Sequence, residues 1–306
     1  MRVGMDVPPP AADRRLFAMG MRLGAIALLS TMIMLIKLAG DAGVHLLEII
    51  FWRQAFMLPV LLVWVGASTG LASLKTDRIG IHARRTILGL IGMVFNFGAV
   101  LLLPLAEATA IGFTVPLFAV ILSAIILREQ VGVHRWSAVV LGFVGVLIVV
   151  QPGGSNIPVL GALSGLTAAI LIAVISIQVR DLTRTEASTT IVFWFAALSV
   201  PVLALVLPWV ATSHGGYEWG LLAAIGTIGA VGQIGLTTAL RYAPVSTVIG
   251  MDYSSLFWAT LFGWLIWERL PSTNTWFGAP IIVASGLYIA WREHRLSIER
   301  TPEVAA

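Results

Sequence analysis

A carboxylate lies inside one of the most apolar stretches of the chain, at Asp252, and Tyr253, Ser255 and Trp258 follow it closely. On a helix, Asp252 and Ser255 would share one face because they are three residues apart. A charge at the centre of a helix in lipid costs about 2.5–3.5 kcal/mol on insertion scales, so Asp252 needs a partner or a wet cavity. The carboxylate could attract an amino group or take up a proton. Alternatively, it is a structural group bonded to a hydroxyl, the backbone or a basic residue.

Two amide side chains, Asn96 and Gln233, stand among glycines in other apolar stretches. An amide in lipid must find hydrogen-bond partners, either in a polar cavity or across closely packed helices. Gln233 and Thr237 are four residues apart and so share a helix face, which favours the cavity. Ser30 is a further candidate for the same lining, although serine often bonds helices together in membranes.

Four charged residues lie nearer the ends of apolar stretches. Arg53 could hold a carboxylate in a bidentate pair. Alternatively, its side chain reaches the membrane interface or pairs with the nearby Glu48. Glu129 and Glu268 each stand next to an arginine where an apolar stretch ends. Their expected positions at opposite membrane faces favour capping or ion pairs at a gate over substrate binding.

The composition requires lipid as the solvent for much of this chain. Of the 306 residues, 58% are hydrophobic and 11% are charged, and the mean hydropathy is +0.94. An ordinary soluble domain has about 25% charged residues. At about 20 residues per crossing, the apolar stretches predict ten membrane-spanning helices, at residues 16–39, 46–66, 86–104, 105–127, 133–151, 159–179, 190–210, 219–240, 243–267 and 273–291.

Several classes of protein are excluded by what this pattern leaves. The short connections offer no room for a soluble catalytic or nucleotide-binding domain, and the sequence has no phosphate-binding loop, H-E-x-x-H or G-x-S-x-G motif. The chain has no cysteine, so it has no disulfide or thiolate metal site. The net charge of +4 is scattered, which does not fit a nucleic-acid surface. We therefore expect no enzyme activity, no cofactor, no metal and no nucleic-acid partner.

The basic residues indicate how the helices are oriented. When the ten spans are threaded alternately, all of the 19 lysines and arginines except Lys37, Arg53 and Arg269 fall on one side. Positively charged residues favour the cytoplasmic side of a membrane. A missed span would disturb this split downstream, so the sequence predicts an all-α membrane protein with ten helices and both termini in the cytoplasm.

The chain also repeats itself. The segment from Phe51 to Leu61 recurs from Phe193 to Leu203 with six identities in eleven positions, and other matches have a similar offset. They include the glycines of the third and eighth predicted helices, at Gly89, Gly92, Gly98, Gly226, Gly229 and Gly235. We predict a tail at 1–15, a five-helix half at 16–151, a second half at 159–291 and a tail at 292–306. An odd number of helices per half makes the second half inverted, as in many secondary transporters.

These features resemble the EamA-type transporters of the drug/metabolite transporter superfamily, over about residues 20–292. The shared pattern reads Ala106, Pro116 and Glu129 in the first half and Ala243, Ser255 and Glu268 in the second. Ser255 departs from it, because the first half has a proline at that place. The resemblance implies alternating access, with the first, third, fourth, sixth, eighth and ninth helices lining the cavity. Within the family it is nearest to bacterial exporters of amino acids, including aromatic ones, and next to S-adenosylmethionine carriers.

The sequence therefore predicts a secondary transporter of small metabolites in the bacterial inner membrane, with an amino acid or related metabolite as substrate and lipid as its surroundings. A channel or a receptor is the alternative class. The spacing of Gly142 and Gly145 predicts close packing of the fifth and tenth helices, within the chain or against another copy. Oligomeric state does not follow from the sequence, which is compatible with a monomer.

Overall fold

A computed structural model describes residues 12–126, 128–152, 157–240, 242 and 249–300. Every regular element in these residues is a helix. The first part of the chain forms α1 (Ala12–Asp41), α2 (Leu46–Ser68), the short η1 (Leu71–Leu74), α3 (Ile79–Leu102), α4 (Leu105–Gly112), α5 (Val115–Ile126) and α6 (Val133–Val150). The second part forms α7 (Val159–Leu182), α8 (Ser188–Val210), α9 (Gly216–Ala239), the short η2 (Ile249–Tyr253), α11 (Ser254–Trp267) and α12 (Thr273–Arg300).

Eight helical segments in the described residues are long and apolar enough to cross a membrane. They are α1 from Leu16, α2, α3, α4 together with α5, α6, α7, α8 and α9. The last two predicted spans correspond to α11, which has 14 residues, and to the longer but less apolar α12. Ala243 and the rest of 243–248 lie outside the described residues. Ten crossings therefore stay a prediction.

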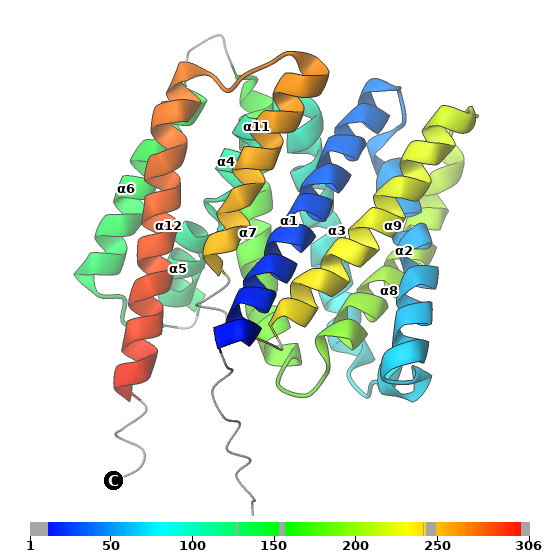
Figure 1. The fold of residues 1–306 in the computed structure, drawn as a ribbon, viewed down its shortest axis with the longest axis horizontal. Helices are drawn as coiled ribbons and strands as arrows, with labels where there is room; N and C mark the ends of the chain where they lie inside the picture. The colour runs from blue at the N-terminus through cyan, green and yellow to red at the C-terminus, as the bar shows by residue number, and fades with distance from the viewer. Residues whose placement is uncertain (1–11, 127, 153–156, 241, 243–248, 301–306) are drawn as a thin grey trace, which may run out of the picture.

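The helices stand side by side in one bundle (Figure 1). The beginning of α1 and the end of α12 lie at the same end of this bundle, which we call the N-terminal face. The connections from α1 to α2, from α8 to α9 and from α11 to α12 lie at the other end, the opposite face. This arrangement agrees with an even number of passes between the first and last helices.

One predicted helix is broken, and another begins as a 3₁₀ helix that passes directly into an α-helix; we call both places interruptions. The predicted span 105–127 divides at Phe113 and Thr114 into α4 and α5, and Pro116 is the second residue of α5, where its missing N–H costs little. In the second half, η2 ends at Tyr253 and α11 begins at Ser254. Ser255 there donates its hydroxyl to the carbonyl of Asp252 at 2.7 Å. The second interruption therefore forms without the proline.

Small residues let the main helix pairs approach closely. The extensive pairs are α1 with α9, α3 with α7, α6 with α12 and α2 with α8. A Cβ on Gly145 would lie 2.9 Å from the carbonyl oxygen of Gly278, so the predicted packing of the fifth and tenth helices is confirmed for this residue. A Cβ on Gly142 would instead lie 2.5 Å from Leu117 of α5, so the prediction that Gly142 packs against the tenth helix was wrong.

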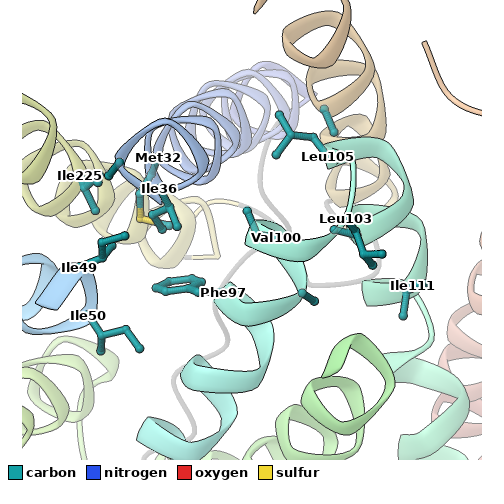
Figure 2. Packing of buried hydrophobic residues seen from close by; sticks show 14 of the residues in the cluster. Met32, Ile36, Ile49, Ile50, Phe97, Val100, Leu103, Leu105, Ile111 and Ile225 are labelled. Atoms are coloured by element: carbon teal, nitrogen blue, oxygen red, sulfur yellow. The ribbon is translucent and has the colours of Figure 1, made fainter. Parts of the chain in front are cut away.

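The largest buried apolar cluster joins both halves of the chain. It includes Ile36 of α1, Ile49 of α2, Phe97 of α3 and Ile225 of α9. Figure 2 shows Met32 and Phe97 pointing into the space between their helices, with Ile49 and Ile225 nearby. The cluster holds together the same helices that carry the polar residues described next.

Candidate functional site

Asp252 forms a bidentate ion pair with Arg22 of α1. The Arg22 Nε and Nη2 atoms donate to the two carboxylate oxygens at 2.7 and 2.6 Å, and its Nη1 donates to the carbonyl of Leu236 on α9 at 3.2 Å. The Arg22 side chain is only 9% exposed, against 35% for Asp252. This pair joins α1, α9 and η2, and it gives Asp252 the basic partner that the sequence left open.

The aromatic and hydroxyl groups around Asp252 contact the two helix interruptions. The ring of Tyr253 lies edge-on to that of Phe113 at 4.8 Å between centroids. Its hydroxyl reaches the surface of α12, where a Cβ on Gly286 would be 2.3 Å away. Trp258 stacks on Phe262 at 5.9 Å. The structure thus places the interruption before α5 beside the interruption before α11.

The predicted cavity residues on α3 and α9 face the inside of the bundle. Asn96 is half-buried and lies on the side of α3 away from the exposed Ile87 and Ile91. Gln233 is also half-buried and lies away from the exposed Val231. No side-chain hydrogen bond joins either amide to another described residue.

The predicted hydroxyls differ in what they do. Thr237 bonds to its own helix, at the carbonyls of Gln233 and Ile234 at 3.1 and 2.9 Å. Ser30 is half-buried on α1. The structure therefore does not gather Asn96, Gln233, Thr237 and Asp252 into one hydrogen-bonded cluster.

Arg53 lies among soft, uncharged groups. Its Nη1 donates to the side-chain oxygen of Gln54 at 2.6 Å, and Nε and Nη1 approach the sulfur atoms of Met32 and Met93 at 3.4 and 3.9 Å. The guanidinium carbon is 5.8 Å from the ring centroid of Phe97. Within the described part of the chain, Arg53 has no carboxylate partner, so the predicted alternative of a pair with Glu48 is wrong.

Glu48 instead pairs with a histidine that the sequence analysis did not single out. Its Oε1 lies 2.6 Å from Nε2 of His214, and it also accepts from the indole of Trp52 at 3.3 Å. The side chains of His214 and Glu48 are 4% and 2% exposed. The pair connects the beginning of α2 with the α8–α9 connection at the opposite face, consistent with a structural or gate-side role for Glu48.

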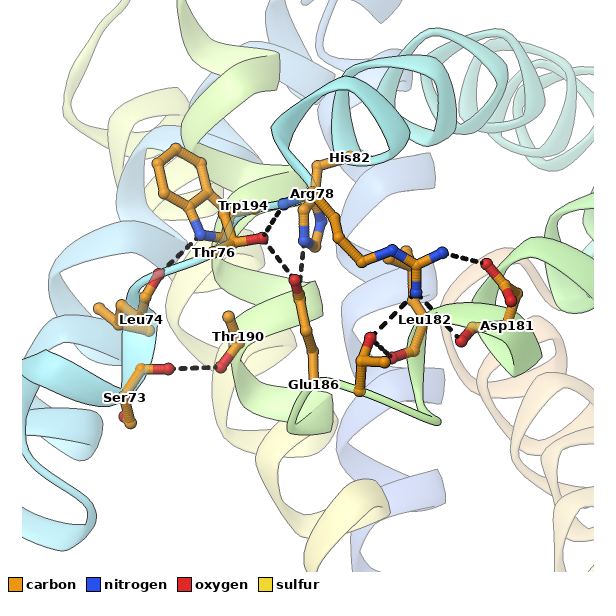
Figure 3. A network of polar contacts seen from close by, with 11 residues as sticks. Ser73, Leu74, Thr76, Arg78, His82, Asp181, Leu182, Glu186, Thr190 and Trp194 are labelled. Atoms are coloured by element: carbon orange, nitrogen blue, oxygen red, sulfur yellow. Dashed lines mark hydrogen bonds and ion pairs between the residues drawn. The ribbon is translucent and has the colours of Figure 1, made fainter.

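A second buried histidine–glutamate pair lies at the N-terminal face (Figure 3). His82 Nε2 is 2.6 Å from Glu186 Oε2, and Thr76 donates to the other oxygen of Glu186. Arg78 beside them pairs with Asp181 at 2.5 Å. These contacts tie the beginning of α3 to the α7–α8 connection. Thus a His–Glu pair links the two halves of the chain at each face.

A small pocket of about 30 Å³ opens between α1, α4 and α11 toward the opposite face. Lys37, Glu107, Trp267 and Arg269 are among its lining residues. Lys37 donates to the carbonyls at the end of α3, at 3.0, 3.3 and 2.8 Å, and so caps that helix. One oxygen of Glu107 accepts from the backbone and a hydroxyl of the α11–α12 region, each at 3.0 Å. Lys37 and Glu107 therefore stabilise helix ends in this pocket.

Glu129 and Glu268 are exposed, and the described residues give neither an ion-pair partner. Each belongs to a helix end of the same design, in which a residue with positive φ is followed by an N–H that bonds six residues back. In the first half Arg128 has φ 53° and Glu129 bonds to Ser123; in the second, Glu268 has φ 52° and Arg269 bonds to Gly263. Glu268 therefore corresponds in geometry to Arg128.

Sequence reasoning missed Arg22, His82 and His214. Arg22 was counted among the basic residues of one membrane face, although it stands six residues inside the first apolar stretch. That depth is the available signal, because a charged group in a span needs a partner. The sequence analysis gave the two histidines no role, and nothing in their spacing indicates partners more than 100 residues away.

Comparison with known proteins identifies the class. The profile of the EamA-like transporter family matches residues 16–151 and 159–291. The chain therefore belongs to the EamA-like transporter family. Together with its apolar helices, this makes it a multi-pass protein of the bacterial inner membrane. The family assignment indicates a transporter rather than an enzyme.

Its relatives carry different cargoes. The chain is 33% identical over 231 residues to a riboflavin transporter of Vibrio cholerae, covering 74% of this chain and 77% of that protein. It is 28% identical to the pseudopaline exporter CntI of Pseudomonas aeruginosa, covering 78% and 84%. It is 27% identical to an S-adenosylmethionine uptake transporter of Rickettsia felis, covering 82% and 85%.

A solved structure confirms the fold alone. A crystal structure with 22% sequence identity superposes with a TM-score of 0.61 and covers 92% of this chain and 99% of that one. At this identity the likeness speaks for the arrangement of the helices and says nothing of the substrate.

Proposed function

We propose that the chain is a secondary transporter that moves small metabolites by alternating access between two inverted five-helix halves, 16–151 and 159–291. Both termini would be cytoplasmic and all ten predicted helices would cross the membrane. The substrate would be an amino acid, with aromatic and hydrophobic amino acids included, and the direction would be export. S-adenosylmethionine or another metabolite is the second candidate substrate class.

The observation that carries the proposal is a set of contacts repeated between the halves. Gly89 of α3 faces Phe195 of α8, and Gly226 of α9 faces Phe56 of α2. Both the glycines and their partners are related by almost the same sequence offset. The same holds for a second pair of contacts: Gly92 lies against Leu171, and the equivalent Gly229 lies against Met32. Equivalent contacts made by swapped partners are what a two-fold relation between inverted halves would produce.

The helix interruptions support a substrate site between the halves. Discontinuous helices near the middle of a membrane are a recurring feature of transporter binding sites, because helix ends offer unpaired backbone groups to a substrate. Phe113 and Tyr253 bring the two interruptions together. Asp252 stands at one of them, paired with Arg22 of the other half. A substrate ammonium could replace Arg22 as the partner of this carboxylate.

An amino-acid substrate is favoured by the mixture of groups inside the bundle. A carboxylate, a guanidinium, two amides and several aromatic rings offer partners for an ammonium, a carboxylate and an apolar side chain. The candidate site residues are Asp252, Tyr253, Ser255, Trp258, Asn96, Gln233, Thr237 and Ser30, with Arg53, Glu48, Glu129 and Glu268 as candidates for gating or ion pairs. S-adenosylmethionine, which carries the same amino-acid group, remains the second candidate because a relative is named for its uptake.

Counterflow in proteoliposomes tests the proposal. Vesicles containing the purified protein are loaded with one unlabelled compound and given the labelled compound outside. The panel holds phenylalanine, leucine, S-adenosylmethionine, riboflavin, a nucleoside and a sugar. We expect saturable uptake that the internal amino acid stimulates. Uptake that is not saturable and not stimulated from the inside, or a current proportional to voltage, would indicate a channel and refute the proposal.

A further inference from the structure

Among the described residues, none supplies an anion to Arg53. We propose that its guanidinium is the group that binds the carboxylate of the transported substrate, which makes carboxylate-bearing metabolites the substrate class. This inference rests on the proposed transport function and assigns a role within it.

The first argument is the cost of the charge. A buried charge is tolerated when it is paired and hydrogen-bonded, and removing one partner of a buried pair costs about 3–5 kcal/mol. Arg53 receives instead one amide oxygen, two thioether sulfurs and an aromatic ring. Thioethers are weak acceptors. These contacts hold the guanidinium in place and leave its charge uncompensated.

The second argument is that two carboxylates inside the bundle already have partners. Glu48, on the same helix, is bound by His214 and Trp52. Asp252 is bound by Arg22. Within the described residues, no acidic group reaches Arg53, and its Nη2 atom has no hydrogen-bond partner. An anion could therefore bind Arg53 through Nη2.

The third argument is the position of Arg53 inside the bundle. Its contacts come from α1, through Met32, and from α3, through Met93 and Phe97. A Cβ on Gly229 of α9 would lie 3.8 Å from its Nε. The residue is nevertheless partly exposed. These contacts place the guanidinium between α1, α3 and α9, in the region where Figure 2 shows Met32 and Phe97.

The chemistry selects a carboxylate. A guanidinium offers two parallel N–H groups that match the two oxygens of a carboxylate, in a charge-assisted pair stronger than a neutral hydrogen bond. A phosphate ester carries up to two charges and would call for a second cation, whereas the groups that hold Arg53 are an amide, two thioethers and an aromatic ring. Riboflavin has no carboxylate, so the inference separates this chain from its riboflavin-transporting relative.

The decisive substitution is Gln54→Glu. The Gln54 oxygen already lies 2.6 Å from Nη1 of Arg53, so a glutamate of nearly the same shape would place a permanent carboxylate there. It would compete with the substrate for the guanidinium while keeping Arg53 in place. Because hydrogen bonds to charged groups contribute about 1.5–3 kcal/mol, we expect carboxylate substrates to lose about 10- to 100-fold in kcat/KM.

The assay compares matched probes in proteoliposomes: phenylalanine with phenethylamine, which lacks only the carboxylate, and riboflavin. The variants are Gln54→Glu, Arg53→Gln and Arg53→Lys, each checked for a monodisperse gel-filtration peak. Arg85→Gln is the matched control. Arg85 also lies over an aromatic ring, at 4.3 Å from Phe195, and its Nε and Nη1 atoms are buried without a partner among the described residues, but it lies nearer the N-terminal face.

The inference predicts that wild type and Arg85→Gln prefer phenylalanine over phenethylamine and that Gln54→Glu and Arg53→Gln lose this preference. Arg53→Lys should keep part of it. An unchanged ratio in Gln54→Glu, or preference of the wild type for riboflavin or phenethylamine, would overturn the inference and leave the transport proposal standing. Absence of saturable flux for every probe in the wild type would overturn the transport proposal itself.

Discussion

Breaking the pair between Arg22 and Asp252 should weaken the contact between the two halves measurably. Asp252→Asn keeps the shape of the side chain and removes its charge. Arg22 would then keep its bond to the carbonyl of Leu236 and lose its anion, although its side chain is only 9% exposed. The Arg22 guanidinium would then be an unpaired charge with little access to water.

The magnitude follows from the burial of both groups. Exposed ion pairs contribute about 0–1 kcal/mol, whereas breaking a buried pair costs about 3–5 kcal/mol. Arg22 is nearly buried, but Asp252 is 35% exposed, so solvent screens the pair in part. We therefore expect a coupling energy of about 2 kcal/mol, or roughly 30-fold in an equilibrium constant.

A double-mutant cycle measures this coupling. Arg22→Gln, Asp252→Asn and the double variant are unfolded in mixed detergent micelles, and the free energies of unfolding are compared. We expect each single variant to be destabilised and the double variant to cost less than the sum. If the two effects add within about 0.5 kcal/mol, the residues do not interact in the folded protein, and the reasoning from their geometry is refuted.

Other changes test the packing and the buried pairs. Gly278→Ala should destabilise the protein by about 1–3 kcal/mol because its Cβ would meet the Gly145 carbonyl at 2.6 Å, whereas Gly220→Ala, with no atom within 4 Å, should be neutral or stabilising; equal effects would contradict this packing. His214→Asn should cost about 1–3 kcal/mol because it leaves the Glu48 carboxylate without its histidine, and an unchanged thermal midpoint would argue against the pair. Lys37→Met should cost about 1–2 kcal/mol by uncapping α3, seen as faster amide exchange near Leu103; unaltered exchange would count against the cap.

The helices could be predicted from the sequence because lipid imposes a simple rule. Apolar stretches of about 20 residues must form helices that satisfy their own backbone groups. The sequence analysis took 105–127 as one continuous span, although Pro116 carries a signal for the interruption before α5, since proline blocks the helical hydrogen bond of the preceding turn. The matching interruption at Tyr253 and Ser254 had no such signal, because a hydroxyl bonding to a local carbonyl is a common event inside unbroken helices as well.

The polar contacts were harder to predict because side-chain partners lie far apart in sequence. Asp252 was recognised as needing a partner, yet its partner Arg22 is 230 residues away. Arg53 was assigned three alternatives, and the structure removes one of them because Glu48 pairs with His214. The internal repeat identified equivalent glycines, because close helix packing requires small residues at both places. It could not identify partners for charged residues that occur in only one half.

The two His–Glu pairs constrain how such a protein can move. Both are closed in the same structure, one at each end of the bundle, and both join α2 or α3 of the first half to the connections flanking α8 of the second. Together they hold α2 and α3 against α8 at both faces of the bundle. We expect the halves to swing about this side of the bundle, so that each mouth widens on the side of α4, α6, α11 and α12.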